Sequence, residues 1–173
     1  MRELAVYDYK NYKENGTVGR RPSVRGVIIR EGKIAMVHSL KYDYYKFPGG
    51  GIDSGESHLD ALIREVREET GLIVIPESVK EYGLVVRREK GRFEDLFIQE
   101  NFYYVCDAED EVACQNLDDY EEEEEFALEW VEPQSAIDVN LHHDHKDKVS
   151  EIAKHMMARE SNVLTRLMED GMF

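Results

Sequence analysis

Alternating and continuous runs of apolar residues predict most of the strands of this chain. The segment Ser23–Leu40 contains two such runs, which meet at Glu31-Gly32, a dipeptide typical of a hairpin turn. A second hairpin is predicted over Glu81–Glu109, with its turn near Gly91. Further short strands are expected at Leu4–Tyr9, Gly71–Ile75 and Phe126–Pro133.

A period of three to four residues in the apolar positions predicts a helix between Ser57 and Gly71. The apolar stripe that would face the core consists of Leu59, Leu62, Ile63 and Val66. Ser57 followed by Asp60 forms a capping-box pattern, and Gly71 suits the C-terminal cap. Two more helices are expected, at residues 133–138 and 145–170. The second carries a packing stripe of Val149, Ile152, Ala153, Met156 and Met157.

The order of these elements predicts the fold class. The glycine-rich stretch Tyr44–Ser57 must be a loop, because glycine favours the interior of neither a helix nor a strand. Several strands with helices between them, in mixed order, indicate an α+β domain with α/β/α layers around a mixed β-sheet. The 173 residues suit one such domain. We expect it to span residues 1–140, with residues 141–173 as a helical extension packed on it.

Composition and charge exclude several classes of partner. Hydrophobic residues make up 42% of the chain, as in ordinary globular proteins. The net charge of −15 disfavours nucleic-acid polymers and anionic membranes, which would repel the chain. No apolar run is long enough to span a membrane, and the N-terminus lacks a signal-peptide pattern. Two cysteines, Cys106 and Cys114, are too few for a disulfide scaffold, so a cytoplasmic location is expected.

Three glutamates crowd one side of the helix predicted after Ser57. Glu65, Glu68 and Glu69 lie at i, i+3 and i+4, where like charges repel each other. Either this face is merely solvated, or it binds a cation. On a helical wheel the three form a ridge beside the apolar stripe, with Ala61 on it, and glycines precede the helix. Carboxylates next to a glycine-lined loop suit Mg²⁺ or Mn²⁺ carrying phosphate groups.

The residues around this ridge resemble a known motif. From Gly50 to Leu72 the chain reads glycine, five residues, Glu56, seven residues and then "REVREETGL". This pattern is similar to the signature of the Nudix hydrolase family at every fixed position. Together with "FPGG" and the flanking strands, the resemblance extends over about Ser23–Asp138 and implies a Nudix-type sandwich fold.

The resemblance also implies a metal site and a reaction. Glu65, Glu68 and Glu69, with the carbonyl of Gly50, would hold one or more divalent cations, Mg²⁺ or Mn²⁺. Arg64 would orient these carboxylates together with Glu56, and Gly49 and Gly50 would line the site. The reaction would be hydrolysis of a nucleoside diphosphate linked to another group X, through attack by a metal-activated water.

The base that takes the proton from this water is left open by the sequence. Glu65 is one candidate. Family members often supply a further glutamate from a loop before a tryptophan-bearing strand. Here "YEEEEEFALE" precedes Trp130, which makes Glu124 and Glu125 candidates, but five consecutive glutamates cannot be told apart by sequence.

The substrate is less constrained than the reaction. The sequence lacks the residues that distinguish ADP-ribose, dinucleoside polyphosphate and coenzyme A hydrolases within the family. A nucleoside triphosphate or related nucleotide metabolite is therefore the default substrate. The segments 19–25 and 85–92 are basic enough to contact one phosphate-bearing small molecule. Tyr42, Tyr44, Tyr45 and Phe47 suit either base stacking or packing, and packing is the favoured interpretation. The histidine-rich segment 141–145 is interpreted as a polar helix cap.

Other functions on the same fold are weighed against hydrolysis. The main alternative is a nucleotide-sensing module without turnover, which the intact Glu68 and Glu69 disfavour. An isomerase is disfavoured because neither cysteine lies in a catalytic pattern, and RNA decapping is opposed by the acidity of the chain. A homodimer through the N-terminal strand and the C-terminal helix is left open.

Overall fold

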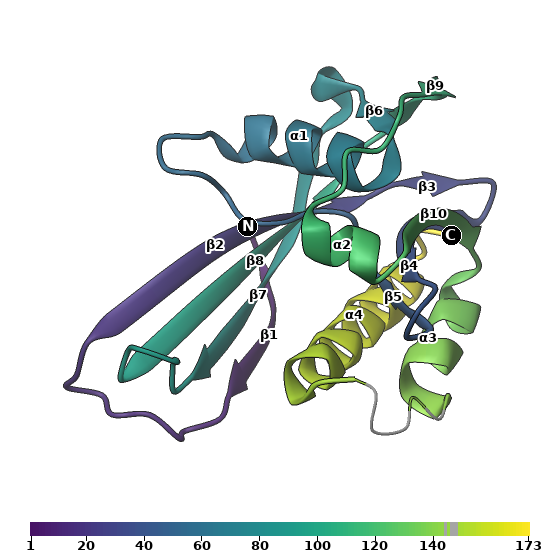
Figure 1. The fold of residues 1–173 in the computed structure, drawn as a ribbon. Coiled ribbons are helices and arrows are strands. Elements are labelled where there is room, and N and C mark those ends of the chain that lie inside the picture. The colour runs from purple at the N-terminus through teal and green to yellow at the C-terminus, as the bar shows by residue number, and fades with distance from the viewer. Residues whose placement is uncertain (144, 146–148) are drawn as a thin grey trace.

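The computed structural model describes residues 1–143, 145 and 149–173. The strands are β1 (Glu3–Asp8), β2 (Val18–Val27), β3 (Ile29–Arg30), β4 (Lys33–Ser39), β5 (Tyr44–Lys46), β6 (Leu72–Val74), β7 (Lys80–Glu89), β8 (Leu96–Val105), β9 (Ala108–Val112) and β10 (Phe126–Val131). The helices are α1 (His58–Thr70), α2 (Asp119–Glu123), α3 (Pro133–His142) and α4 (Glu151–Glu169), with a 3₁₀ turn at Pro76–Ser78. Figure 1 shows their arrangement.

The strands form mixed sheets, as predicted. The larger sheet has the order β1-β7-β8-β2, in which β7 and β8 are antiparallel while β1 and β2 pair in parallel with β7 and β8. A second sheet has the order β10-β4-β3, with β5 also paired to β4, and β6 pairs with β9. A bridge between Ser23 and Gly51 ties the glycine loop to β2.

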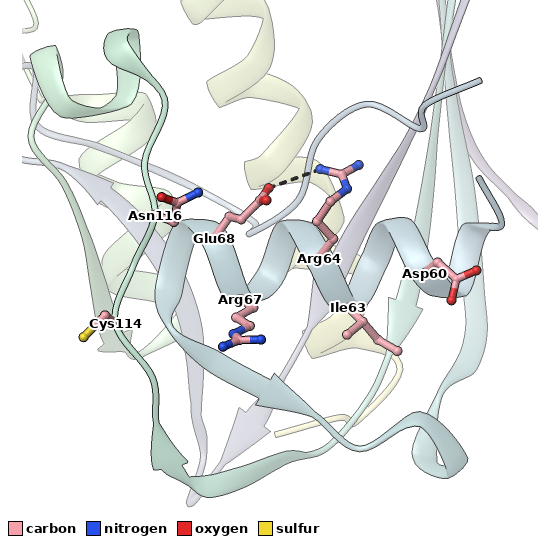
Figure 2. A pocket seen from close by; sticks show the side chains of 7 residues that line it. All are labelled: Asp60, Ile63, Arg64, Arg67, Glu68, Cys114 and Asn116. Carbon is pink, nitrogen blue, oxygen red and sulfur yellow. Dashed lines mark hydrogen bonds and ion pairs between the residues drawn. The ribbon is translucent and has the colours of Figure 1, made fainter. Parts of the chain in front are cut away.

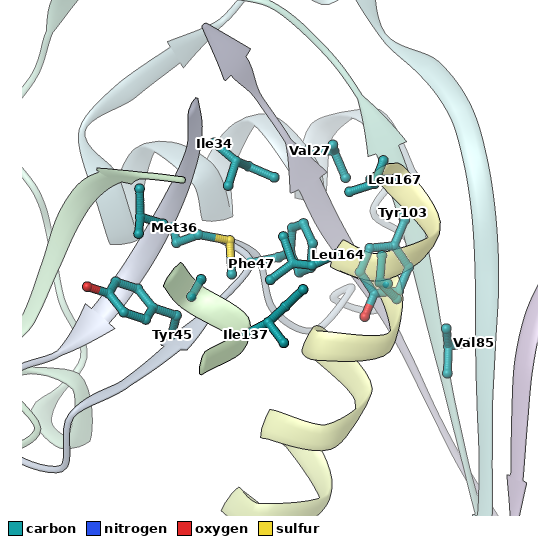
Figure 3. Packing of buried hydrophobic residues seen from close by; sticks show 13 residues of the cluster. Val27, Ile34, Met36, Tyr45, Phe47, Val85, Tyr103, Ile137, Leu164 and Leu167 are labelled. Atoms are coloured by element: carbon teal, nitrogen blue, oxygen red, sulfur yellow. The ribbon is translucent and has the colours of Figure 1, made fainter. Parts of the chain in front are cut away.

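Successive residues of β4 face different apolar clusters, of which the described residues form three. In β4, Ile34 and Met36 pack with residues of α3 and α4, while Ala35 between them packs with α1. Figure 3 shows the first core, in which Leu164 and Leu167 of α4 meet the strand residues. Successive side chains of a strand point to opposite faces of the sheet. Helices cover both faces and so bury the apolar side chains on each. The predicted α/β/α layering is confirmed.

The two predicted hairpins are confirmed. Glu31 and Gly32 both have positive φ, 52° and 76°, as a tight two-residue turn between β3 and β4 requires. The predicted strands at Leu4–Tyr9, Gly71–Ile75 and Phe126–Pro133 correspond to β1, β6 and β10.

Three elements were not predicted from the sequence. Strand β5 lies at the start of the segment expected to be a loop, and β9 is an acidic strand with exposed side chains. Helix α2 occupies most of the acidic run after Asp118, where the chain was expected to be only a connector. Neither β9 nor α2 carries an apolar periodicity that sequence analysis could detect.

Helix α1 has the predicted ends but a different buried face. The Ser57 side chain accepts a hydrogen bond from the Asp60 N–H, and the N–H of Gly71 donates to the Arg67 carbonyl. The predicted stripe was wrong at Leu59, which is 39% exposed. Ala61, placed on the carboxylate ridge by the wheel, is instead fully buried in the core.

Helix α4 begins at Glu151, later than predicted, with the Ser150 side chain as its N-terminal cap. Residues 144 and 146–148 of the predicted cap and helix lie outside the described residues. Val149 and Met157 are buried as expected, but Ile152 is 67% exposed, so that part of the packing stripe was wrong. The expected boundary at residue 140 stays a prediction, and α4 shares its core with β4.

Candidate active site

The glycine loop is fixed over the end of α1 by Glu69. One carboxylate oxygen of Glu69 accepts from Lys46 Nζ at 2.7 Å, and the other accepts from the Gly49 N–H at 2.8 Å. The Arg25 guanidinium donates to the Gly49 carbonyl. Gly49 has φ 136°, and a Cβ there would lie 2.1 Å from the Val24 carbonyl oxygen. Only glycine therefore allows the loop to lie this close to β2.

Glu69 does not lie on an exposed ridge, contrary to the wheel-based expectation. Its residue exposure is 1%, because the loop and β5 cover it. Burial raises the pKa of its carboxyl group to about 7, and the nearby Lys46 and Arg25 oppose this shift. The structure thus separates Glu69 from Glu65 and Glu68, which face the cavity described below.

Arg64 holds the remaining carboxylates together. Its Nε and Nη2 donate to the two oxygens of Glu56, both at 2.8 Å, in a bidentate pair. Its Nη1 donates to Glu65 at 2.8 Å and to Glu68 at 3.2 Å. Hydrogen bonds from Arg64 and from the Asp53 N–H lower the pKa of Glu56 to about 2. These contacts match the orienting arrangement expected for Arg64 and Glu56.

Glu65 lies against the backbone of the loop. A Cβ on Gly50 would come within 2.3 Å of a Glu65 carboxylate oxygen, so a larger residue there would displace this carboxylate. Burial raises the pKa of Glu65, and the hydrogen bond from Arg64 opposes this shift. Glu65 and the Gly50 backbone are therefore close neighbours, and their joint binding of a cation stays a prediction.

A cavity of about 420 Å³ opens over these groups. It is lined by Arg21, Gly50, Gly51, Asp53, Arg64, Glu65, Glu68, Asn116, Asp118, Tyr120 and Glu121. Its walls come from β2, from the glycine loop with α1 that follows it, and from α2 with the residues just before it. It combines carboxylates with two guanidinium groups.

Glu121 is the member of the acidic run that reaches this cavity. It is buried, and its carboxylate accepts from the Tyr120 hydroxyl at 2.8 Å and from the Asp118 N–H at 3.0 Å. The Lys46 Nζ lies 4.0 Å from it. The only signal for Glu121 in the sequence is the capping-box spacing from Asp118, which fixes it three residues into α2.

Glu124 and Glu125 lie elsewhere, contrary to their selection as candidate bases. Neither is among the described residues that line the cavity. The Glu124 carboxylate accepts from the Tyr44 hydroxyl, and Glu125 follows α2 with a positive φ of 54°. The Glu124 carboxylate therefore contacts β5 rather than the cavity.

The donor chemistry of the cavity fits a hard divalent cation. Glu65 and Glu68 supply carboxylate oxygens, and the Gly50 carbonyl keeps a second lone pair while it accepts from the Val24 N–H at 2.9 Å. Among the described residues, no three His, Cys, Asp or Glu side chains already converge on one metal position. The carboxylates are instead held by the protein's own cations, Arg64 and Lys46.

A second cavity, of about 390 Å³, lies on the outer side of α1 (Figure 2). Arg64, Glu68 and Asn116 line both cavities, and this one adds Arg67, Ile63, Asp60 and Cys114. Its lining is less acidic than that of the first cavity. We therefore regard the first cavity as the candidate active site.

Other residues considered from the sequence have structural contacts. Tyr44, Tyr45 and Phe47 are buried, which confirms the packing interpretation. Cys106 is buried and Cys114 is exposed, and both are free thiols. His143, at the end of α3, bonds to Asp43 at 2.7 Å.

One face of the larger sheet gathers buried donors near α4. The unpartnered atoms among the described buried side chains are Arg25 Nε, Arg87 Nε, Asn101 Nδ2 and Arg159 Nε. Gln99, Asn101 and Tyr103 alternate along β8 and so share a face, and Arg87 and Arg25 lie opposite the first and the last of them. Arg159 of α4 donates to Asn101 at 3.1 Å. Arg21, at the cavity wall, also lies opposite Gln99.

Comparison with known proteins places these features in a family. A model of the NUDIX domain matches residues 19–155. RNA pyrophosphohydrolases from Xanthomonas campestris pv. campestris (strain B100) and Stenotrophomonas maltophilia (strain K279a) are 35% and 33% identical to the chain over 89 residues. The matched part is 51% of this chain and 42% of each relative, so the chain spans less than half the length of these relatives.

Solved structures agree on the fold. The E. coli ORF135 protein has a TM-score of 0.56 at 20% identity, covering 87% of this chain and 92% of that one. The NUDIX hydrolase from Nitrosomonas europaea has a TM-score of 0.57 at 16% identity, covering 83% and 89%. Within the described residues, no helix has both the length and the apolarity needed to cross a membrane.

Proposed function

Because this chain belongs to the Nudix hydrolase family, we propose that it is a pyrophosphohydrolase dependent on Mg²⁺ or Mn²⁺. It would hydrolyse a phosphoric anhydride bond in a nucleoside diphosphate linked to another group X. The observation that supports this most is a single cavity lined by Glu65, Glu68 and Glu121 together with Arg21 and Arg64. Carboxylates suit the cation, and guanidinium groups suit the phosphates.

Several residues in and beside the cavity have a role in this proposal. A divalent cation at Glu65, Glu68 and the Gly50 carbonyl would neutralise the diphosphate and lower the pKa of a bound water. Arg64 holds Glu65 and Glu68 in place, and Glu56 fixes Arg64 from its other side. Glu121 replaces Glu124 and Glu125 as the downstream candidate for the base, with Glu65 as the alternative.

The proposed substrate is a nucleoside triphosphate or related nucleotide metabolite. Arg21 and Arg64 in the cavity lining suit a ligand that carries several phosphate groups. The name of the relatives, RNA pyrophosphohydrolase, adds RNA as a candidate substrate. The net charge of −15 favours a small substrate over a polymer. A cytoplasmic location fits the two free cysteines.

A panel assay tests the function. Phosphate and pyrophosphate release would be measured with and without Mg²⁺ on common and oxidised nucleotides, nucleotide sugars, ADP-ribose, dinucleoside polyphosphates and a short 5′-triphosphate RNA. We expect Mg²⁺-dependent release, with a free nucleotide preferred over the RNA. Binding without release from any substrate would contradict the proposal and support a nucleotide-sensing module.

Arg21 offers a sharper test of the phosphate subsite. Its neighbour Arg20 points to the other face of β2 and bonds to Glu100 at 3.4 Å, outside the cavity lining, so it is a matched control. Arg21→Gln should raise KM roughly tenfold, because a charge-assisted contact to phosphate contributes about 1–2 kcal/mol. Arg20→Gln should leave KM unchanged. Equal KM values in the two variants would remove Arg21 from the substrate site.

A further inference from the structure

Lys46 is a buried cation at the inner end of the carboxylate cluster. It is the last residue of β5, only 8% exposed, and its backbone is fixed by pairing with Val37 of β4. Its Nζ lies 2.7 Å from Glu69 and 4.0 Å from Glu121, and 4.4 Å from the centre of the Phe126 ring. Two acidic side chains and one aromatic face therefore surround the ammonium group.

The position of Lys46 determines which carboxylate oxygens of the cluster a divalent cation can reach. Both Glu69 oxygens are already engaged, one by Lys46 and the other by the Gly49 N–H. Glu121 is engaged by Tyr120 and Asp118, with Lys46 next to the same oxygen that Tyr120 binds. Removing the lysine would leave two buried carboxylates with no other cation as near among the described residues, a costly arrangement unless another cation replaced it.

The Glu65–Glu68 end of the cluster differs. There the side chains of Arg64 and Glu68 are 30% and 35% exposed, and the carboxylates of Glu65 and Glu68 line the open cavity. A divalent cation can enter at this end while it keeps some of its waters, as Mg²⁺ prefers. Each end holds one resident cation, but the ends differ in their free oxygens. Arg64 engages one oxygen each of Glu65 and Glu68, whereas both oxygens of Glu69 and both of Glu121 are engaged.

We propose that Lys46 acts as a built-in cation that closes the Glu69–Glu121 end to divalent ions in the substrate-free protein. Divalent ions then bind at the Glu65–Glu68 end, and Glu121 is kept metal-free as a base. This inference rests on the proposed function, because it assumes that the cluster binds Mg²⁺ or Mn²⁺. Lys46 is a positioning residue in this scheme.

Binding of Mn²⁺ to the substrate-free protein tests the proposal. Stoichiometry and affinity would be measured by electron paramagnetic resonance and calorimetry. Lys46→Met should bind one additional Mn²⁺ or bind Mn²⁺ at least tenfold more tightly, and Lys46→Arg should behave as wild type. Lys41→Met is the matched control, since Lys41 also contacts a glutamate (Glu123, 2.8 Å) and an aromatic ring (Tyr42) but lies outside the cavity lining.

A second variant keeps the test decisive if Lys46→Met does not fold. Glu121→Gln keeps the shape of the side chain and should leave Mn²⁺ affinity of the resting protein within twofold of wild type. A tenfold loss of affinity in Glu121→Gln, or wild-type stoichiometry and affinity in a folded Lys46→Met, would overturn the proposal. Failure of the proposed function would differ from both, because the wild-type protein itself would then bind no Mn²⁺ and release no phosphate.

Discussion

Glu68 and Glu69 are adjacent in sequence but have opposite environments. Glu68 lines the cavity beside Arg64, whereas Glu69 is buried under the glycine loop and bonded to Lys46. Their positions on α1 differ by about 100° around the helix axis, enough to turn one toward the cavity and the other toward the loop. The carboxylate of Glu68 therefore faces the cavity, whereas the carboxylate of Glu69 holds the glycine loop in place.

Substituting these two glutamates should separate the roles. Glu68→Gln is expected to abolish Mg²⁺-dependent turnover, because it removes a proposed metal ligand. Glu69→Gln is expected to lower turnover, because the glycine loop loses part of its anchor. Only Glu69→Gln should also destabilise the fold, by up to about 3 kcal/mol, because it removes one partner of a buried ion pair. Urea unfolding beside the activity assay measures both effects. Near wild-type turnover in both variants would refute the carboxylate assignment.

The two cysteines should differ in reactivity. Burial, with a contribution from Asp107, raises the pKa of Cys106 to about 12, while Cys114 is exposed. Because the thiolate is the reactive form, one thiol per native chain should react with a disulfide reagent at pH 8. Two should react after unfolding in urea. Rapid reaction of two thiols in the native protein would contradict the described burial of Cys106.

For single residues, the sequence predicted the chemical roles of the side chains better than their positions in the structure. Arg64 and Glu56 could be paired in advance because the resemblance names them as partners. The burial of Glu69 depends on where the glycine loop returns, which no pattern within α1 encodes. Glu121 could not be chosen among identical neighbours, since only the backbone path of α2 distinguishes them.

The glycine loop is the element that brings β2, β5 and α1 to one place. Its three consecutive glycines have unequal surroundings. A Cβ at Gly49 or Gly50 would collide with the Val24 carbonyl or the Glu65 carboxylate, whereas at Gly51 the nearest atom is the Arg21 Nε at 3.6 Å. Three identical residues thus carry different structural constraints.

Alanine substitutions along the loop should show these constraints. Gly49→Ala should lower the free energy of unfolding by about 1–3 kcal/mol, because its φ of 136° is strained for any other residue. Gly51→Ala should be nearly neutral and serves as the control. Chemical denaturation of both variants gives the comparison, and equal stabilities would contradict the loop geometry.

Elements with local signals were predicted, and elements that depend on distant partners were not. Helix α1 carries its periodicity and both of its caps in its own sequence. Strand β9 is acidic and exposed along most of its length, and it exists because β6 pairs with it. Its formation follows from tertiary context rather than from propensity.

For the whole molecule, the core shared by α4 and the strands argues that the C-terminal segment folds with the rest. Leu164→Ala should cost about 2–5 kcal/mol of stability, because a fully buried side chain leaves a cavity. Ile152→Ala, on the same helix but 67% exposed, should change stability by less than about 0.5 kcal/mol. A single unfolding transition is expected in both. Two separate transitions would instead support an independent extension.

Strands β1 and β2 each pair in parallel with a strand that comes much later in the chain, and this has a consequence for folding during synthesis. Strand β1 pairs with β7 up to Arg88, and β2 pairs with β8 up to Val105. During synthesis, β1 and β2 therefore leave the ribosome long before β7 and β8, so the strands with which they pair are not yet present. Such pairings between distant segments slow folding and leave edges exposed to other chains meanwhile. The completion of β8 is the step at which the larger sheet can first close.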